Sequence, residues 1–175
     1  MSEGFNVNEP VEIDVQDVKE QRIVIPAAKD VKFRIKKAEL RMRRVKSEKE
    51  GGTGEDNPPV TKHIALELSL VEGIGEGKFK NKSMFQDVTY WADPAVKISD
   101  WYKNKQHLVP LRFLLSALGI PLKGSIGDEL ISQLTGRDLL GTISLKKMQA
   151  FDPSTGKYVD TDDFKNEVGK FKAAI

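Results

Sequence analysis

The sequence predicts a mainly β domain with two helices inserted before its last strands. Residues 31–46, 62–71 and 83–91 alternate apolar and polar side chains, as strands do when one face packs on a core and the other meets water. Leucines at three- and four-residue spacing then mark a helix, and a further strand follows near residue 139. The order of these segments favours an antiparallel sheet with a helical insertion.

The first strand, residues 31–46, changes phase midway. Its apolar residues occupy odd positions up to Ile35 and even positions from Ala38 to Met42. One extra residue at Lys36 or Lys37 would keep both halves facing the same core, which predicts a β-bulge that bends the strand. A long, bent strand is what a small closed barrel requires.

This strand also holds the densest run of positive charge. Residues 32–49 contain nine Lys or Arg and two Glu, a local surplus of +7 in a chain whose net charge is +2. The balancing acid lies in residues 1–20, which have a net charge of −5. Such a dipolar chain can bind a polyanion on one face. The alternative interpretation is a lysine-rich strand face that only resists aggregation.

The length of 175 residues predicts one domain, over residues 21–175, preceded by an acidic arm at 1–20. The arm is either a loosely held strand or a mobile terminus. Residues 47–60 combine glycines with Asn57, Pro58 and Pro59, which predicts a long flexible loop able to cover a binding groove. Without cysteine, signal peptide or an apolar run of about 20 residues, the chain is expected to be cytoplasmic.

The second and third strands carry a histidine and several aromatic residues whose side-chain directions follow from alternation. His63, on the polar face of residues 62–71, is expected to be exposed beside the loop. Alternation in residues 83–91 places Tyr90 on the face of Val88 and Trp91 on the opposite face. Aromatic groups are therefore expected on both sides of the third strand, one side being core and the other open to a ligand.

The C-terminal half contains the helices. Pro110 and the leucine repeat predict a main helix at about 109–118, ended by Gly119, and a short helix follows at about 128–134. A strand is expected at 139–148, a turn at 152–157, and a last short strand at Tyr158 and Val159. The residues from Asp160 onward are expected to form a tail of mixed charge.

Three glycines and a lysine at residues 73–78 invite comparison with a phosphate-binding loop. A Walker loop requires glycine five residues before its Gly-Lys pair and Ser or Thr after it, but those positions hold Glu72 and Phe79. A hairpin turn is therefore predicted there.

The sequence offers little for catalysis. It has no cysteine nucleophile, no serine with a credible His and Asp context, and no histidine pair at metal-ligand spacing. We therefore expect a protein that is not an enzyme and uses no cofactor or metal.

Nucleic-acid binding is favoured instead. Proteins that bind single strands combine a positive groove for phosphates with aromatic faces on which bases stack. This chain has cations on its bent strand and aromatic residues near its third strand. The candidate nucleic-acid-binding residues are Arg34, Lys36, Arg41, Arg43, Arg44, Lys62, Tyr90, Trp91, Trp101 and Tyr102. For the aromatics, the alternative is a place in the core.

The order of elements resembles that of phage-encoded single-stranded DNA-binding proteins of the OB-fold type. The likeness rests on a leucine-rich helix ending in Leu-Gly, a Leu-x-Gly-Arg step into a strand, and a final hairpin. The residues that carry it are Leu114, Leu115, Leu118, Gly119, Leu134, Gly136 and Arg137.

The resemblance implies a five-stranded OB-like antiparallel barrel that binds single-stranded DNA in replication, recombination or repair, in the host-cell cytoplasm. DNA is the expected ligand, RNA stays open, and replication or recombination proteins are candidate partners. Such proteins commonly end in an acidic tail, whereas residues 160–175 have a net charge of only −1. The acidic arm at 1–20 is the candidate substitute. The alternative function is that of a phage accessory or structural protein whose basic barrel face binds an acidic protein.

Overall fold

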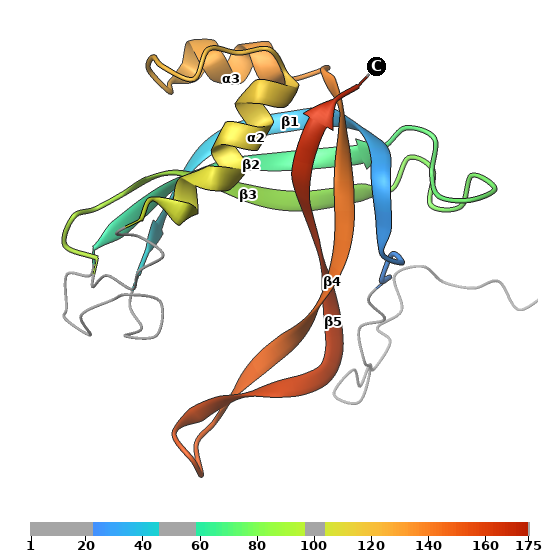
Figure 1. Cartoon of the computed structure of the whole chain (residues 1–175). Coiled ribbons are helices and arrows are strands. Elements are labelled where there is room, and N and C mark those ends of the chain that lie inside the picture. The colour runs from blue at the N-terminus through green and yellow to red at the C-terminus, as the bar shows by residue number, and fades with distance from the viewer. Residues whose placement is uncertain (1–22, 46–58, 97–103, 175) are drawn as a thin grey trace, which may run out of the picture.

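The computed structural model describes residues 23–45, 59–96 and 104–174, and within them the chain forms one five-stranded antiparallel sheet with two α-helices (Figure 1). The strands are β1 (Ala28–Arg44), β2 (Val60–Leu70), β3 (Ser83–Ala92), β4 (Asp138–Asp152) and β5 (Lys157–Ala173), in the sheet order β3-β2-β1-β4-β5. The helices are the 3₁₀ turn η2 (Gln106–Leu108), α2 (Val109–Ala117) and α3 (Asp128–Leu134). The predicted mainly β class and both predicted helices are confirmed.

The bulge predicted in the first strand is present. Ile35 pairs with Leu68 and Lys37 pairs with Glu67, so Lys36 is the extra residue on β1. The apolar residues after the bulge accordingly return to the face that packs on the core. Met42 keeps this face but is 71% exposed, because the core has ended at that point.

The core lies on one face of the sheet and is completed by the helices. Its largest fully buried residues are Phe33, Ile35, Ile64, Leu66, Leu68, Leu70, Val88, Val96, Leu114, Leu134, Leu139 and Ile143. Helix α2 packs against β5 and β3, and α3 packs against β1. The alternating apolar residues of the strands and the leucine repeat of α2 thus bury against one another.

Strands β3 and β5 end the sheet order on opposite sides, yet they approach each other beside α2. The backbone N–H of Val168 on β5 donates to Gln86 Oε1 on β3 at 2.9 Å. This contact uses a side chain, and no backbone ladder joins the two strands in the described part of the chain. The sheet therefore curves strongly without being closed by a fifth pairing.

Glycine at position 141 lets β4 approach the core closely. A Cβ added there would lie 2.9 Å from Val168 Cγ1 and 3.2 Å from Phe33 Cε2, both tighter than ordinary packing contacts. Any larger residue would push β4 away from β1 and β5. The Leu-Leu-Gly step into β4 is therefore a packing requirement.

The last strand is far longer than predicted. β5 spans 17 residues and pairs with β4 to the tip, so residues 160–173 are strand and not a tail. The prediction failed because both faces of the outer half of this hairpin meet solvent, which removes the alternation that marks a half-buried strand. The outer half projects from the body of the molecule as a two-stranded ribbon (Figure 1).

Both predicted turns are confirmed. Ile74 and Lys78 exchange backbone hydrogen bonds of 2.7 and 3.0 Å, which makes residues 73–78 a hairpin turn. At the tip of the β4–β5 hairpin, the Asp152 carboxylate accepts hydrogen bonds from Ser154 and Thr155, and these lower the pKa of Asp152. The predicted acidic arm at 1–20 and most of the predicted loop at 47–60 lie outside the described residues.

Candidate nucleic-acid interface

The predicted site residues separate onto two surfaces of the β1–β2–β3 ribbon. Side chains on successive strand positions point to opposite faces. We call the face opposite the core the outer face; it carries Arg34, Lys36, Arg41 and Arg43. The core-side face runs past the end of the core and there carries Arg44, Lys62, Tyr90 and Trp91.

Carboxylates of the same sheet pair with most cations of the outer face. Arg34 makes a two-pronged contact with Asp138, with Nε–Oδ1 at 2.7 Å and Nη2–Oδ2 at 3.0 Å. Lys36 Nζ lies 3.2 Å from Glu67 Oε1, and Arg41 Nε donates to Glu39 Oε1 at 2.6 Å. The charge surplus read from the sequence is therefore partly neutralised on this face.

The pKa values of these carboxyl groups are lowered, as expected for acids that pair with cations. A hydrogen bond from Arg34 lowers the pKa of Asp138. Hydrogen bonds from Lys37 and then Arg41 lower the pKa of Glu39, and those from Ser83 and Lys36 lower the pKa of Glu67. All three carboxylates thus stay ionised at neutral pH and oppose an approaching polyanion.

His63 is buried, so the prediction that it is exposed was wrong. Its side chain lies between two threonines, with Nε2 2.7 Å from Thr61 Oγ1 and Nδ1 3.0 Å from Thr89 Oγ1. Burial, reinforced by the charge of Arg43, lowers the pKa of His63, although Asp87 acts in the opposite direction. The cause of the burial is sheet order: β2 lies between β1 and β3, whose side chains cover its outer face.

Phe85 is an outer-face residue absent from the predicted site. It is 73% exposed and lines a shallow hollow of about 100 Å³ together with Lys37, Arg41 and Asp87. Its position was available in the sequence, because alternation sets Phe85 opposite the core residue Met84. An exposed aromatic among cations and acids gives the outer face one stacking surface of its own.

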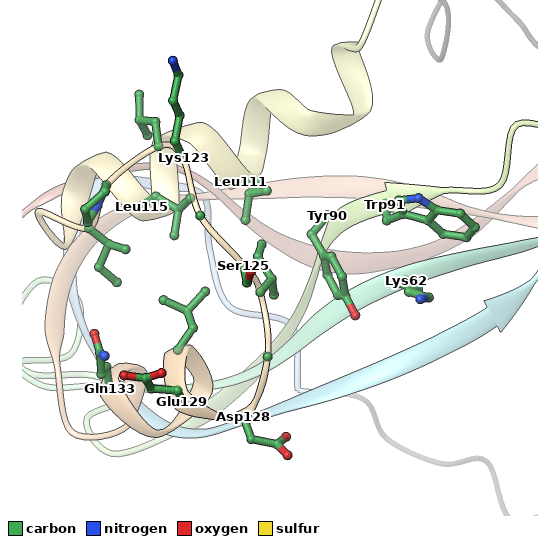
Figure 2. A pocket seen from close by; sticks show the side chains of 17 residues that line it. Lys62, Tyr90, Trp91, Leu111, Leu115, Lys123, Ser125, Asp128, Glu129 and Gln133 are labelled. Carbon is green, nitrogen blue, oxygen red and sulfur yellow. The ribbon is translucent and has the colours of Figure 1, made fainter.

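The core-side surface opens into a cleft of about 660 Å³, which we call the end cleft (Figure 2). One wall comes from β2 and β3, and the other from α2, the segment 120–127 and α3. The residues that line it are Lys62, Tyr90, Trp91, Leu111, Leu115, Ile120, Pro121, Leu122, Lys123, Gly124, Ser125, Ile126, Gly127, Asp128, Glu129, Leu130 and Gln133.

A second bulge places two consecutive aromatic residues in the end cleft. Lys62 pairs with Trp91 and His63 pairs with Thr89, so Tyr90 is the extra residue on β3. The bulge returns Trp91 to the core-side face, where both rings line the cleft (Figure 2). The prediction that Tyr90 and Trp91 face opposite ways was therefore wrong, because strict alternation does not survive a bulge.

Lys62 and Trp91 form a cation–π pair. The ammonium nitrogen lies 4.9 Å from the ring centroid, within the range in which a cation is attracted to an aromatic face. Trp91 is 39% exposed, whereas Tyr90 packs partly against the core. Among the described residues, no carboxylate lies within salt-bridge distance of Lys62. The pair thus offers both an accessible ring and a lysine that no carboxylate of the described residues neutralises.

The structure brings only part of the predicted site together. Lys62, Tyr90 and Trp91 share the end cleft, and Arg44 lies exposed on the same face of the ribbon, opposite Val60. Arg34, Lys36, Arg41 and Arg43 belong to the outer face. Trp101 and Tyr102 lie outside the described residues.

Within the described ranges, no group of three or more His, Cys, Asp or Glu side chains is placed to hold a metal ion. No helix in those ranges has the length and apolar character needed to span a bilayer. No protein-family model matches the chain, and no curated protein is similar to it in sequence.

Proposed function

We propose that this protein binds single-stranded DNA, largely without sequence preference, and that the end cleft is its principal base-stacking site. The observation that carries the proposal is the Lys62–Trp91 pair with Tyr90 beside it on one wall of the cleft. Single-strand binders use this combination, because the aromatic faces stack on bases of any sequence while cations contact the phosphates.

The ligand must present unstacked bases. A ring at the wall of a cleft can be covered by a base only if that base has left its own stack, as bases of single strands readily do. The cleft volume of about 660 Å³ exceeds what one base occupies, so a nucleotide and part of its backbone fit inside. Lys62 and Lys123 line the same cleft and supply charge for a phosphate, with Asp128 and Glu129 on the α3 side of it.

The sheet order supports an OB-like barrel. In an OB fold, a meander of three strands is followed by a helix and a hairpin, and strand 1 pairs with both strand 2 and strand 4. The order β3-β2-β1-β4-β5, with α2 and α3 between β3 and β4, agrees with this arrangement. We propose that the approach of β3 to β5 beside α2 is where the barrel closes. OB folds bind oligonucleotides over strands 2 and 3. Both candidate surfaces, the end cleft with Trp91 and the outer face with Phe85, include residues of β3.

We place this binding in phage-type replication, recombination or repair, with DNA as the ligand and RNA as the competing one. The second candidate is a phage accessory or structural protein that binds an acidic protein through the basic strand. The ion pairs of Arg34, Lys36 and Arg41 weigh against it, since an acidic partner would have to displace carboxylates already in place.

Tryptophan fluorescence during titration with an oligo-dT single strand tests the proposal. Quenching is expected for the wild type and is expected to shrink in Trp91→Phe, which removes the cleft tryptophan and leaves Trp101 as the only one. A gel-shift series with single- and double-stranded DNA and with RNA, at two salt concentrations, should show preference for single strands and weaker binding at high salt. A flat fluorescence signal with no gel shift would contradict the proposal and favour the protein-binding candidate.

A further inference from the structure

The outer half of the β4–β5 hairpin is a second distinctive surface. We call residues 145–166 the distal hairpin; they extend beyond the body of the protein as a ribbon of two strands (Figure 1). Nearly all its residues are exposed or only partly buried. A two-stranded ribbon by itself is marginally stable in water, because neither face is covered.

One face of the distal hairpin carries most of its large apolar side chains. Phe151 pairs directly with Tyr158, and their rings meet edge to face with centroids 5.5 Å apart. Six residues further from the tip on each strand, alternation places Leu145 and Phe164 on the same face, because the register irregularity between Asp160 and Phe164 adds two residues to β5 and so leaves the parity unchanged. These four side chains, the apolar stripe, are 38% to 55% exposed. Val159 lies on the opposite face, next to Tyr158 in sequence.

The charge of the distal hairpin is balanced, unlike that of a nucleic-acid-binding surface. Four lysines and four aspartates cancel between residues 145 and 166. On the face of the apolar stripe, Lys147 belongs to β4, whereas Asp160 belongs to β5. The face therefore carries a lysine on β4 and an aspartate on β5. Asp160 also accepts a hydrogen bond of 3.0 Å from Gln149, and this polar pair lies between the Phe151–Tyr158 pair and the other two apolar residues.

We propose that the apolar stripe packs against the same stripe of a second copy of this chain. A two-fold axis parallel to the strands, lying between two hairpins stacked face to face, sets β4 of one copy over β5 of the other. This arrangement places Phe151 over Tyr158 of the second copy and brings Lys147 toward the second copy's Asp160. The surface is thus complementary to itself in charge, and it sets apolar side chains of one copy against those of the other.

The inference is independent of the proposed function, because it uses no residue of the end cleft. The test measures the mass of the full-length protein in solution. Light scattering after gel filtration gives this mass over a wide range of protein concentration. The wild type is expected to reach twice the chain mass of 19.6 kDa at high concentration. Phe151→Ser with Tyr158→Ser should raise the dimer dissociation constant by about tenfold or more, since buried aromatic anchors dominate interfaces.

Two controls separate this interface from general damage. Val159→Ser removes a side chain that is 44% exposed on the opposite face and should leave the dimer intact. Lys147→Glu should weaken the dimer, and adding Asp160→Lys should restore it, because the swap rebuilds the same cross-copy pairs. Circular dichroism should show the body of the protein unchanged in every variant, since none of these side chains belongs to the core. The charge swap leaves the Phe151–Tyr158 ring pair in place, so it tests the interface even where the double serine variant loosens the hairpin.

A wild type that stays monomeric at every concentration overturns the inference. So does a dimer that survives Phe151→Ser with Tyr158→Ser, or a charge swap that fails to restore it. A monomeric wild type whose oligo-dT affinity falls in the double serine variant would also overturn it, and would make the distal hairpin a nucleic-acid contact. Absence of oligo-dT binding would instead contradict only the proposed function.

Discussion

The outer face and the end cleft of the β1–β2–β3 ribbon differ in how their charges are used. The outer face carries more cations, but Arg34, Lys36 and Arg41 each contact a carboxylate of the same sheet. In the end cleft, Lys62 contacts an aromatic ring and has no carboxylate partner among the described residues. The number of cations on a strand is therefore a poor measure of the charge available to a ligand.

The same comparison distinguishes the two exposed aromatic residues as stacking surfaces for a base. Phe85 is the more exposed ring, but Glu39, Glu67 and Asp87 line the hollow around it. Trp91 has a lysine at its face and a second aromatic residue beside it. The end cleft holds Lys62 and Lys123 together with Asp128 and Glu129, and Lys62 is the cation at the Trp91 ring. In the hollow at Phe85, the cations Lys37 and Arg41 already pair with Glu39, and two further acids line it.

The largest change in oligo-dT affinity is expected for Trp91, and Phe85 is the matched comparison. Trp91→Ala should lower the affinity for oligo-dT by about tenfold or more, because each stacked base contributes about 1–3 kcal/mol. Phe85→Ala should change the affinity by less than about threefold, because fewer phosphates approach that ring. Equilibrium titration of both variants checks this. A larger loss in Phe85→Ala would reverse the comparison and move the site to the outer face.

A smaller effect is expected from single lysines. Lys62→Gln should reduce affinity about threefold to tenfold and make the slope of log K against log salt shallower by about 0.7, the value for one phosphate contact on a single strand. Lys36→Gln is the matched control, and its slope should stay near that of the wild type because Glu67 already pairs with Lys36. Equal slopes in the two variants would show that the ion pair does not withhold Lys36 from the ligand.

Removing a carboxylate from the outer face tests, in the opposite direction, whether ion pairs withhold its cations from the ligand. Glu39→Gln frees Lys37 and Arg41, and it should raise oligo-dT affinity by about twofold at low ionic strength, with the gain vanishing at high salt. Titration at two salt concentrations measures it. A gain well above this, or one that persists in high salt, would mean that the outer face binds the strand directly.

The smallest effect concerns pH and stability. Burial lowers the pKa of His63, so the unfolded chain binds more protons than the native state as this group titrates. Its contribution to stability is complete above the unfolded pKa of about 6.5 and is lost as pH falls through the lower native pKa. Urea unfolding between pH 7.5 and 5.5 should show a falling midpoint, and the fall should be smaller in His63→Gln. An equal fall in that variant would assign the effect to other groups.

Much of the fold could be predicted because half-buried strands leave a periodic pattern. The phase change near Lys36 located the first bulge, and the leucine repeat located α2. The outer part of β5 was missed, since exposure of both faces erases the pattern. The burial of His63 was missed because it depends on which strands flank β2, and sheet order is not a local property.

For the site, the sequence determined the residue types: a basic first strand and an aromatic third strand. Only the tertiary structure decided which of them meet. The bulge at Tyr90 turns Trp91 toward Lys62, and α2 with the segment 120–127 builds the opposite wall of the cleft. Partners such as Asp138 and Glu67 come from other strands. Charge compensation and cleft formation depend on contacts between distant segments, and these contacts exist only once the sheet has assembled.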